Sequence, residues 1–374
     1  MSGFAVQGWC PGALRPMMSG DGLVVRVRLP FGRMTKGQAV GLADAAMQHG
    51  NGLIDLSARG NLQLRGVGQA SHPTLIADLQ ALALVDEDVQ AEARRNILVT
   101  PFADTETLAL AQRLTEAMRD GPDLPGKFGF AVDTGKRPIL QDISADIRLE
   151  HDAAGRLLLR SDGMALGLLV SAETAPEQAV TLARWFIEQG GMQDGRGRMA
   201  ALIARGITPP GATTAPAAAQ HAPEPGLRAD GALVALEFGQ MRAETLHALA
   251  ALGPLRVTPW RMLLIEGARA LPALPGVILD PADPLRRVEV CTGAPGCLQA
   301  HAPLRDLARS LAPHHGKGVL HLSGCAKGCA HPGRAAVTLV ATPGGFDLIL
   351  NGTAQDAPCQ RGILAQDIDL KGLM

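Results

Sequence analysis

Four of the six cysteines form two close pairs that could bind a metal centre. Cys291 and Cys297 lie in CTGAPGC, and Cys325 and Cys329 lie in CAKGC. A thiolate is a soft, anionic ligand, and a cubane of four irons takes four of them. Structural zinc is the alternative, but zinc sites favour tighter cysteine pairs with two residues between the ligands. The spacing therefore favours an iron–sulfur cluster over zinc.

Small residues surround the paired cysteines, among them Gly293, Gly296, Gly324 and Gly328. Their size lets backbone N–H groups approach the sulfurs, and such hydrogen bonds tune the reduction potential of a cluster. Cys10 and Cys359 stand alone in the sequence. Because a lone cysteine is more often a small buried apolar residue than a ligand, we leave both out of the predicted site.

Composition limits the class of protein. The chain has 374 residues, of which 47% are hydrophobic and 19% charged, so it can bury a large core. It has neither an apolar run of roughly 18 residues nor a secretion signal, so we expect a cytoplasmic protein without membrane contact. Cysteines in that compartment need a role other than disulfides. The balance of 35 basic and 36 acidic residues, and the absence of tyrosine, argue against a nucleic-acid partner.

Two parts of the chain repeat one order of predicted elements. The first has a strand, a helix and a second strand at residues 23–29, 35–49 and 62–64, with FGRM at 31–34. The second has the same order at residues 233–236, 243–252 and 262–265, with FGQM at 238–241. Ser57-Ala58-Arg59 aligns with Thr258-Pro259-Trp260, and Gly66 aligns with Gly267. An internal duplication follows from this alignment.

Later parts of each half also resemble each other: residues 127–135 and 146–163 match residues 318–328 and 338–352 as a strand, a loop and a hairpin. Between the halves, residues 208–226 are rich in Pro, Ala and Thr and have no helix or strand periodicity. We expect an α+β fold of two duplicated halves, with mixed sheets and pseudo-twofold symmetry. A ligand site between the halves is expected.

The sequence CTGAPGC followed by SGCAKGCAHP resembles the signature of the siroheme-dependent sulfite and nitrite reductase superfamily, whose members have duplicated halves. The resemblance spans nearly the whole chain. It implies a [4Fe–4S] cluster on the four paired cysteines, with Cys329 as the ligand that bridges to siroheme iron in the reductases. It also implies five units: ferredoxin-like half-repeats at 1–75 and 227–285, a sulfite reductase-like lobe at 76–207, the linker at 208–226 and a cluster lobe at 286–374.

Three further motifs resemble anion-binding motifs of that superfamily. SARGNLQLRG (57–66) places Arg59, ARRNIL (93–98) places Arg95 and LPGKFGF (124–130) places Lys127 at positions that bind substrate or tetrapyrrole. Arg65 is included because it lies further along the strand that follows Arg59. Gly129 stands where the reductases have a second lysine, and this departure points to chemistry other than the reduction of a small anion.

The run CPGALRPMMSGDGLVVRV (10–27) and the TPWR element (258–261) are most similar to the precorrin-3B synthase branch, in which the tetrapyrrole is the substrate. This resemblance implies an oxygen-dependent hydroxylation of precorrin-3A at C20, with γ-lactone formation, in aerobic cobalamin biosynthesis. It also implies a mononuclear non-haem iron, for which His331 is a candidate ligand. A substrate with many carboxylates suits the predicted arginines and lysine.

Two other functions stay open: a siroheme-dependent sulfite or nitrite reductase, and a non-catalytic iron–sulfur protein that binds a tetrapyrrole. GRGRMA (195–200) fits a nicotinamide-binding pattern, but it follows a predicted helix instead of a strand. Because no flavin or nicotinamide motif is found, we expect a separate electron donor or reductase to supply the electrons.

Overall fold

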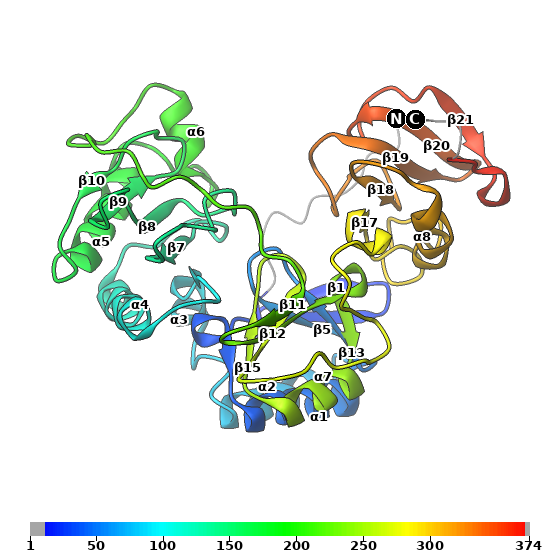
Figure 1. Cartoon of the computed structure of the whole chain (residues 1–374), viewed down its shortest axis with the longest axis horizontal. Helices are drawn as coiled ribbons and strands as arrows, with labels where there is room; N and C mark the ends of the chain where they lie inside the picture. The colour runs from blue at the N-terminus through cyan, green and yellow to red at the C-terminus, as the bar shows by residue number, and fades with distance from the viewer. Residues whose placement is uncertain (1–11, 371–374) are drawn as a thin grey trace.

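A computed structural model describes residues 12–370 of the chain. A central lobe lies between two outer lobes, which stand apart from each other on the same side of it (Figure 1). The described residues form four sheets, two in the central lobe and one in each outer lobe. Helices occur together with mixed and antiparallel sheets, so the predicted α+β class is confirmed.

The two central sheets have matching strand orders. The first runs β1 (Met17–Ser19), β2 (Gly22–Val27), β5 (Leu62–Val67), β4 (Leu53–Leu56) and β13 (Gln240–Arg242). The second runs β11 (Gly226–Arg228), β12 (Gly231–Leu236), β15 (Met262–Glu266), β14 (Leu255–Val257) and β3 (Arg33–Met34), with β16 (Val277–Ile278) also paired to β12. Three helices cover these sheets: α1 (Lys36–His49), α2 (His72–Ala81) and α7 (Ala243–Leu252).

Each central sheet contains one strand from the other half of the chain. β3 of the FGRM segment pairs with β14, and β13 of the FGQM segment pairs with β4. Phe31 and Phe238 take equivalent positions in these segments, and both have a positive φ of 53°. The predicted duplication is therefore confirmed, and the halves are joined by exchanged strands that the sequence pattern alone did not reveal.

Local capping fixes where α1 begins. The Thr35 hydroxyl accepts a hydrogen bond from the Gln38 amide at 3.2 Å, and the Gln38 side chain accepts one from the Thr35 amide at 3.0 Å. This reciprocal pair satisfies two backbone donors that a helix start leaves open. α1 packs against α7, its equivalent in the second half, so the core of the central lobe is shared by both halves.

The outer lobes have one topology. The first sheet runs β10 (Leu168–Leu169), β9 (Leu157–Ser161), β8 (Ile147–His151), β7 (Phe130–Asp133) and β6 (Ile97–Val99). The second runs β21 (Gln360–Ile363), β20 (Gly345–Gly352), β19 (Ala335–Thr342), β18 (Leu320–Ser323) and β17 (Val288–Val290). In each lobe the first three strands along the chain pair in parallel and the last two are antiparallel.

Helices complete the outer lobes. The first lobe has α3 (Val89–Arg94), α4 (Thr105–Ala117), α5 (Ala175–Glu188) and α6 (Met199–Ala204), and the second has α8 (Arg305–Leu311). Short 3₁₀ turns lie at Pro30–Gly32, Met118–Asp120, Glu237–Gly239, Pro284–Arg287, Ala312–His314 and Ala365–Asp367. No helix among residues 12–370 is long and apolar enough to cross a bilayer.

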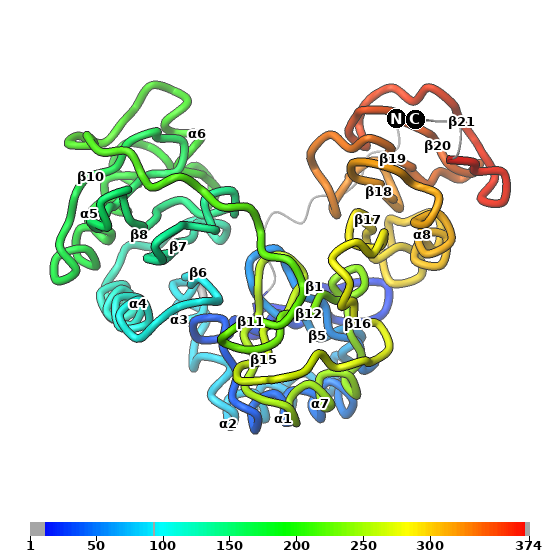
Figure 2. The backbone as a smooth tube through the Cα atoms, viewed as in Figure 1, coloured from blue at the N-terminus to red at the C-terminus, as the bar shows by residue number. Residues whose placement is uncertain are grey.

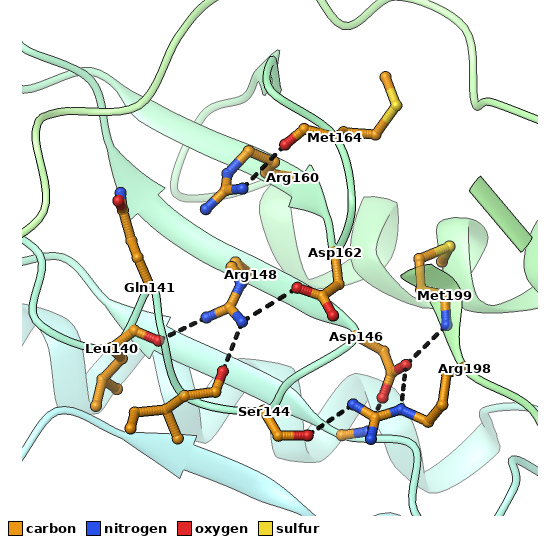
Figure 3. A network of polar contacts seen from close by, with 12 residues as sticks. Leu140, Gln141, Ser144, Asp146, Arg148, Arg160, Asp162, Met164, Arg198 and Met199 are labelled. Atoms are coloured by element: carbon orange, nitrogen blue, oxygen red, sulfur yellow. Dashed lines mark hydrogen bonds and ion pairs between the residues drawn. The ribbon is translucent and has the colours of Figure 1, made fainter. Parts of the chain in front are cut away.

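A buried polar network holds a loop against the first outer sheet (Figure 3). Arg148 on β8 donates from Nη1 to the Leu140 carbonyl at 2.7 Å. Asp146, which is fully buried, accepts hydrogen bonds at 2.8 Å from Arg198 Nε and from the Met199 amide. The loop at 134–145 is thereby fixed to the face of the sheet opposite α4 and α5.

The linker at 208–226 passes from the first outer lobe to the central lobe (Figure 2). The Ala217 amide donates to the His151 carbonyl at 2.9 Å, and the Gln220 amide donates to the Pro138 carbonyl at 2.8 Å. These bonds attach the segment to the first outer lobe as far as Gln220. It contains no helix, as its composition predicts.

Candidate active site

The cysteine loops meet at one edge of the second outer sheet. Cys291 directly follows β17, and Cys325 follows its parallel neighbour β18. Carboxyl ends of parallel neighbours lie at the same edge of a sheet, which brings the loops together. The Gly324 amide donates to the Cys291 sulfur at 3.2 Å, and the His301 amide donates to the Gly324 carbonyl at 2.9 Å. The two loops are therefore bonded to each other through Gly324.

Gly324 is needed for this close approach. A Cβ atom at that position would lie 2.6 Å from the Ala300 Cβ and 3.4 Å from the Cys291 sulfur. The first distance is far inside van der Waals contact. A side chain at Gly324 would push the two cysteine loops apart.

The four paired cysteines influence one another electrostatically. Burial raises the pKa of the Cys291 thiol, and Cys297 and Cys325 raise it further, against the opposing effect of the Gly324 and Gly293 amides. Burial also raises the pKa of Cys329, where Lys327 opposes the effect of the other three cysteines. Four thiols in one region, with amides directed at sulfur, have the donor chemistry of an iron–sulfur site.

A pocket of about 570 Å³ lies between the central lobe and the cysteine loops. Cys291 and Cys329 line it, as do Ala222 and Pro223 of the linker. The other walls come from both central sheets and the second outer lobe, including Asp55, Ala58, Gln63, Trp260, Arg261, Arg286, Glu289, Arg305 and His331. Two of the four paired cysteines thus face a space large enough for a sizeable part of an organic ligand.

Three arginines supply positive charge to the pocket wall. Arg261 Nη2 lies 2.8 Å from a Glu289 carboxylate oxygen. Arg305 donates to the Gln240 side chain and lies 3.9 Å from Asp55. Burial lowers the pKa of Arg305 and raises that of Asp55, although each charge opposes the shift of the other. Arg286, the third, donates to the Pro281 carbonyl at 2.5 Å.

These three arginines were not among the predicted site residues. For Arg261 the alignment held a signal, because the equivalent residue of the first half is Gly60. The structure shows that both residues have a positive φ, 59° at Arg261 and 65° at Gly60. An arginine held in a conformation that favours glycine is an uncommon feature that concentrates at functional sites. Arg305 and Arg286 had no comparable signal, because the folding of the second outer lobe alone brings them to the pocket.

The four predicted cationic residues lie outside the lining of this pocket. Arg59 is half-buried in the turn before β5, next to Ala58, which does line it. Arg65 is buried and donates to Asp21 and to the Gly296 carbonyl. Arg95 pairs with Asp86 at 3.0 Å and donates to the Arg28 carbonyl at 2.8 Å. Lys127 is exposed in a turn before β7.

Gly129 has no open space beside it. A Cβ atom there would lie 2.5 Å from the Asn96 side-chain nitrogen and 3.1 Å from the Asn96 carbonyl oxygen. The Gly129 amide donates to Asp146 at 3.0 Å. The glycine is thus explained by its packing against Asn96, and this position offers no room for a bulky substrate.

Two histidines lie beside the cysteine loops. His321 is fully buried opposite Glu289 in the strand register, and neither ring nitrogen has a hydrogen-bond partner among the described residues. Burial, with a smaller effect of His331, lowers the pKa of His321 to about 4. The ring of His331 lies 5.8 Å from that of His321. Among residues 12–370, no three His, Cys, Asp or Glu side chains are arranged to hold a metal ion.

Cys359 is exposed, and its thiol donates to the Leu348 carbonyl at 3.3 Å. It lies outside the pocket lining, and its exposure contradicts the expectation that a lone cysteine is a small buried apolar residue. Cys10 lies outside the described residues.

Comparisons with known proteins agree with this architecture. Residues 15–82 match the nitrite/sulfite reductase ferredoxin-like half domain family. The chain resembles the NirA protein of Mycobacterium tuberculosis in structure, with a TM-score of 0.60 and 19% identity over 88% of this chain and 74% of that one. At that identity the similarity establishes the fold.

Sequence relatives separate the branches. A ferredoxin–nitrite reductase of Synechococcus elongatus is 32% identical, but over only 33% of this chain and 26% of its own. A precorrin-3B synthase of Sinorhizobium sp. is 32% identical over 94% of this chain and 84% of its own. Since only the second similarity runs through the central lobe and both outer lobes, the chain belongs to the precorrin-3B synthase family.

Proposed function

We propose that this protein is an oxidoreductase that hydroxylates precorrin-3A to precorrin-3B, with dioxygen as co-substrate, in aerobic cobalamin biosynthesis. The reaction places a hydroxyl group at C20 and closes a γ-lactone. The observation that carries the proposal is similarity to a precorrin-3B synthase along 94% of the chain. The sequence similarity to the nitrite reductase of Synechococcus elongatus covers only 33% of the chain.

The pocket supports a polyanionic substrate. Arg261, Arg286 and Arg305 line it, and a guanidinium can hold a carboxylate through two parallel hydrogen bonds. Arg305 is largely removed from solvent, which strengthens its attraction for a carboxylate. We assign these three arginines to the substrate carboxylates. Arg59 joins them as a fourth candidate, because its neighbour Ala58 lines the same pocket.

A [4Fe–4S] cluster on Cys291, Cys297, Cys325 and Cys329 is part of this proposal. Its support is the meeting of the two cysteine loops and the amides that approach the Cys291 sulfur. When bound, the cluster supplies single electrons. The protein's part is to hold the four thiolates and to position the substrate against the pocket wall that contains Cys291 and Cys329.

Two further partners are proposed on the family resemblance. A separate electron donor or reductase would deliver electrons. A mononuclear non-haem iron would be a second metal centre; His331 faces the pocket and is its candidate ligand. The competing function is a siroheme-dependent sulfite or nitrite reductase, in which the same pocket would hold siroheme.

Separate assays with the two kinds of substrate distinguish these functions. Purified protein is reduced with a flavodoxin and its reductase, then given either precorrin-3A in air or sulfite and nitrite under argon. We expect consumption of precorrin-3A and of oxygen, with no loss of sulfite or nitrite. Turnover of sulfite or nitrite by a siroheme-loaded preparation, with precorrin-3A unchanged, would establish the reductase instead.

A further inference from the structure

One carbonyl in the first cysteine loop is held by three donors from the other half of the chain. Gly296, which directly precedes Cys297, accepts hydrogen bonds from the Ser19 hydroxyl at 2.5 Å and the Gly20 amide at 3.2 Å. Arg65 Nη2 is the third donor, at 3.1 Å. The turn between β1 and β2 therefore lies directly on the segment that carries a proposed cluster ligand.

Arg65 is fixed in this position by two carboxylates. It is 5% exposed, and its Nε and Nη2 donate to the two oxygens of Asp21 at 3.1 and 2.9 Å. Asp55, which lines the pocket, lies 3.7 Å from Arg65 Nε. Such a bidentate pair sets the direction of a guanidinium as well as its charge. Arg65 is thus a rigid bridge from the central sheet to the Gly296 carbonyl.

The second half contains an equivalent ion pair in which the acidic and basic positions are exchanged. The alignment of Gly66 with Gly267 places Arg65 opposite Glu266 and Asp55 opposite Arg256. Arg256 pairs with Glu266 at 2.5 Å. Its Nη1 donates to the Pro101 and Ala103 carbonyls at 3.0 Å, in the loop that follows β6 of the first outer lobe. Each central sheet thus uses an arginine to hold the loop after the first strand of one outer lobe.

Only the loop held by Arg65 contains cysteines. Thr100 follows β6 where Cys291 follows β17, and the loop held by Arg256 has no thiol. The Cys297 amide donates back to the Gly293 carbonyl at 2.8 Å, so the peptide group between Gly296 and Cys297 is bonded on both sides. A shift of Arg65 would therefore move Cys297 directly.

We propose that Arg65 is a positioning residue for Cys297, and not a ligand of the substrate. By fixing the Gly296 carbonyl it sets the place of the Cys297 thiolate, and hence the stability and electronic structure of the cluster. Contacts one step beyond a metal ligand orient that ligand and tune the metal. This inference rests on the proposed cluster.

The test compares Arg65→Met with Arg256→Met, the matched change in the other half. Arg65→Met should increase the rate at which a chelator removes iron by about 10-fold, the lower end of what loss of such an outer contact costs. It should also change the electron paramagnetic resonance spectrum of the reduced cluster. Arg256→Met should lower the melting temperature but leave the spectrum and the rate of iron loss unchanged. Arg65→Lys should show a smaller change in both measurements than Arg65→Met, because a lysine keeps a cationic donor.

Gly20→Ala provides a second route to the same loop without a change of charge. Its Cβ would lie 2.0 Å from the Pro295 carbonyl oxygen, so the hairpin or the loop must move. We expect the same spectral change as in Arg65→Met, and agreement of the two variants would support positioning even if Arg65→Met folds poorly.

The contrary outcomes are distinct. A wild-type spectrum and iron-loss rate in both Arg65→Met and Gly20→Ala would overturn the inference while the cluster proposal stands. Weaker binding of precorrin-3A by Arg65→Met, with an unaltered cluster, would make Arg65 a substrate ligand. Absence of iron and sulfide from the wild-type protein purified under argon would overturn the cluster proposal itself, and this inference with it.

Discussion

Cys325 lies outside the pocket lining, so its replacement tests the cluster without changing the pocket wall. We expect Cys325→Ser to abolish the broad visible absorption of the cluster and its iron and sulfide, because a neutral hydroxyl is a poor substitute for a soft thiolate. The measurement is iron and acid-labile sulfide per chain. Cys359→Ser is the control and should keep both, since Cys359 is exposed and its thiol donates to the Leu348 carbonyl. Full iron and sulfide in Cys325→Ser would remove Cys325 from the ligand set.

Arg305 tests the pocket. We expect Arg305→Gln to weaken precorrin-3A binding by about 2–5 kcal/mol, because a substrate carboxylate would lose a partner away from solvent. Titration of the protein with precorrin-3A under argon measures the affinity. Arg309→Gln is the control: Arg309 lies one turn further along α8, pairs with Glu237 and Asp306, and is outside the pocket lining. Equal affinities for the two variants would argue against Arg305 as a substrate ligand.

At the residue scale, the sequence showed which residues could bind a metal or an anion, but it did not show which groups they contact. The cysteine spacing led directly to the two loops that the structure brings together. By contrast, the position of Arg65 on a strand could not show whether it binds a substrate carboxylate or the carboxylate of Asp21, because a guanidinium binds both in the same way. Arg261 was visible in TPWR, but its significance depends on its backbone conformation.

At the scale of elements, Glu266 on β15 links two strands of the second central sheet. Arg33, and then Arg256, lower the pKa of Glu266 from 4.5 to about 2. A carboxyl with a depressed folded-state pKa stabilises the protein above its unfolded value, and this contribution is lost as the pH falls toward the folded value. The ionised Glu266, bound by both arginines, therefore stabilises the sheet above about pH 4.5 and progressively less between pH 4.5 and about pH 2.

We expect Glu266→Gln to lower the free energy of unfolding at pH 7 by about 1–3 kcal/mol, because charge-assisted hydrogen bonds are lost. Urea unfolding at several pH values measures this difference, which should shrink below about pH 4.5. Exposed Glu87 is the control, and Glu87→Gln should stay within about 0.5 kcal/mol of the wild type. A constant difference from pH 7 to pH 3 would contradict the assignment.

The elements themselves were largely predictable. The repeats at FGRM and FGQM led to α1, α7 and their neighbouring strands, because hydrophobic periodicity and the Thr35 cap act locally. β4 and β14 were missed, since strands of four and three residues leave little pattern. The exchange of β3 and β13 between the halves depends on tertiary pairing, which no local pattern records.

At the scale of the molecule, duplication produced two outer lobes of one topology but different chemistry. The first outer lobe has Thr100 and Gly135 at the loop positions where the second has Cys291 and Cys325. Its equivalent edge is occupied by Asp133, which accepts hydrogen bonds from the Ile139 and Leu140 amides at 2.6 and 2.8 Å. One outer lobe therefore offers a thiolate site, and one cluster per chain is expected.

The arrangement of lobes also bears on the reaction. The pocket is walled by both central sheets, the linker and the cysteine loops, so a substrate in it would touch parts of the chain that are far apart in sequence. A tetrapyrrole with peripheral carboxylates could bind the arginines at its edge while its ring faces the cysteine loops.

The most direct test of precorrin-3A hydroxylation is the fate of isotopic oxygen. Purified protein, a flavodoxin with its reductase, precorrin-3A and ¹⁸O₂ are incubated, and the product is analysed by mass spectrometry. We expect a product that has gained one oxygen atom, labelled from the gas, and no label when the isotope is supplied in water. A product without label from ¹⁸O₂, or precorrin-3A recovered unchanged while the protein reduces sulfite or nitrite, would contradict it.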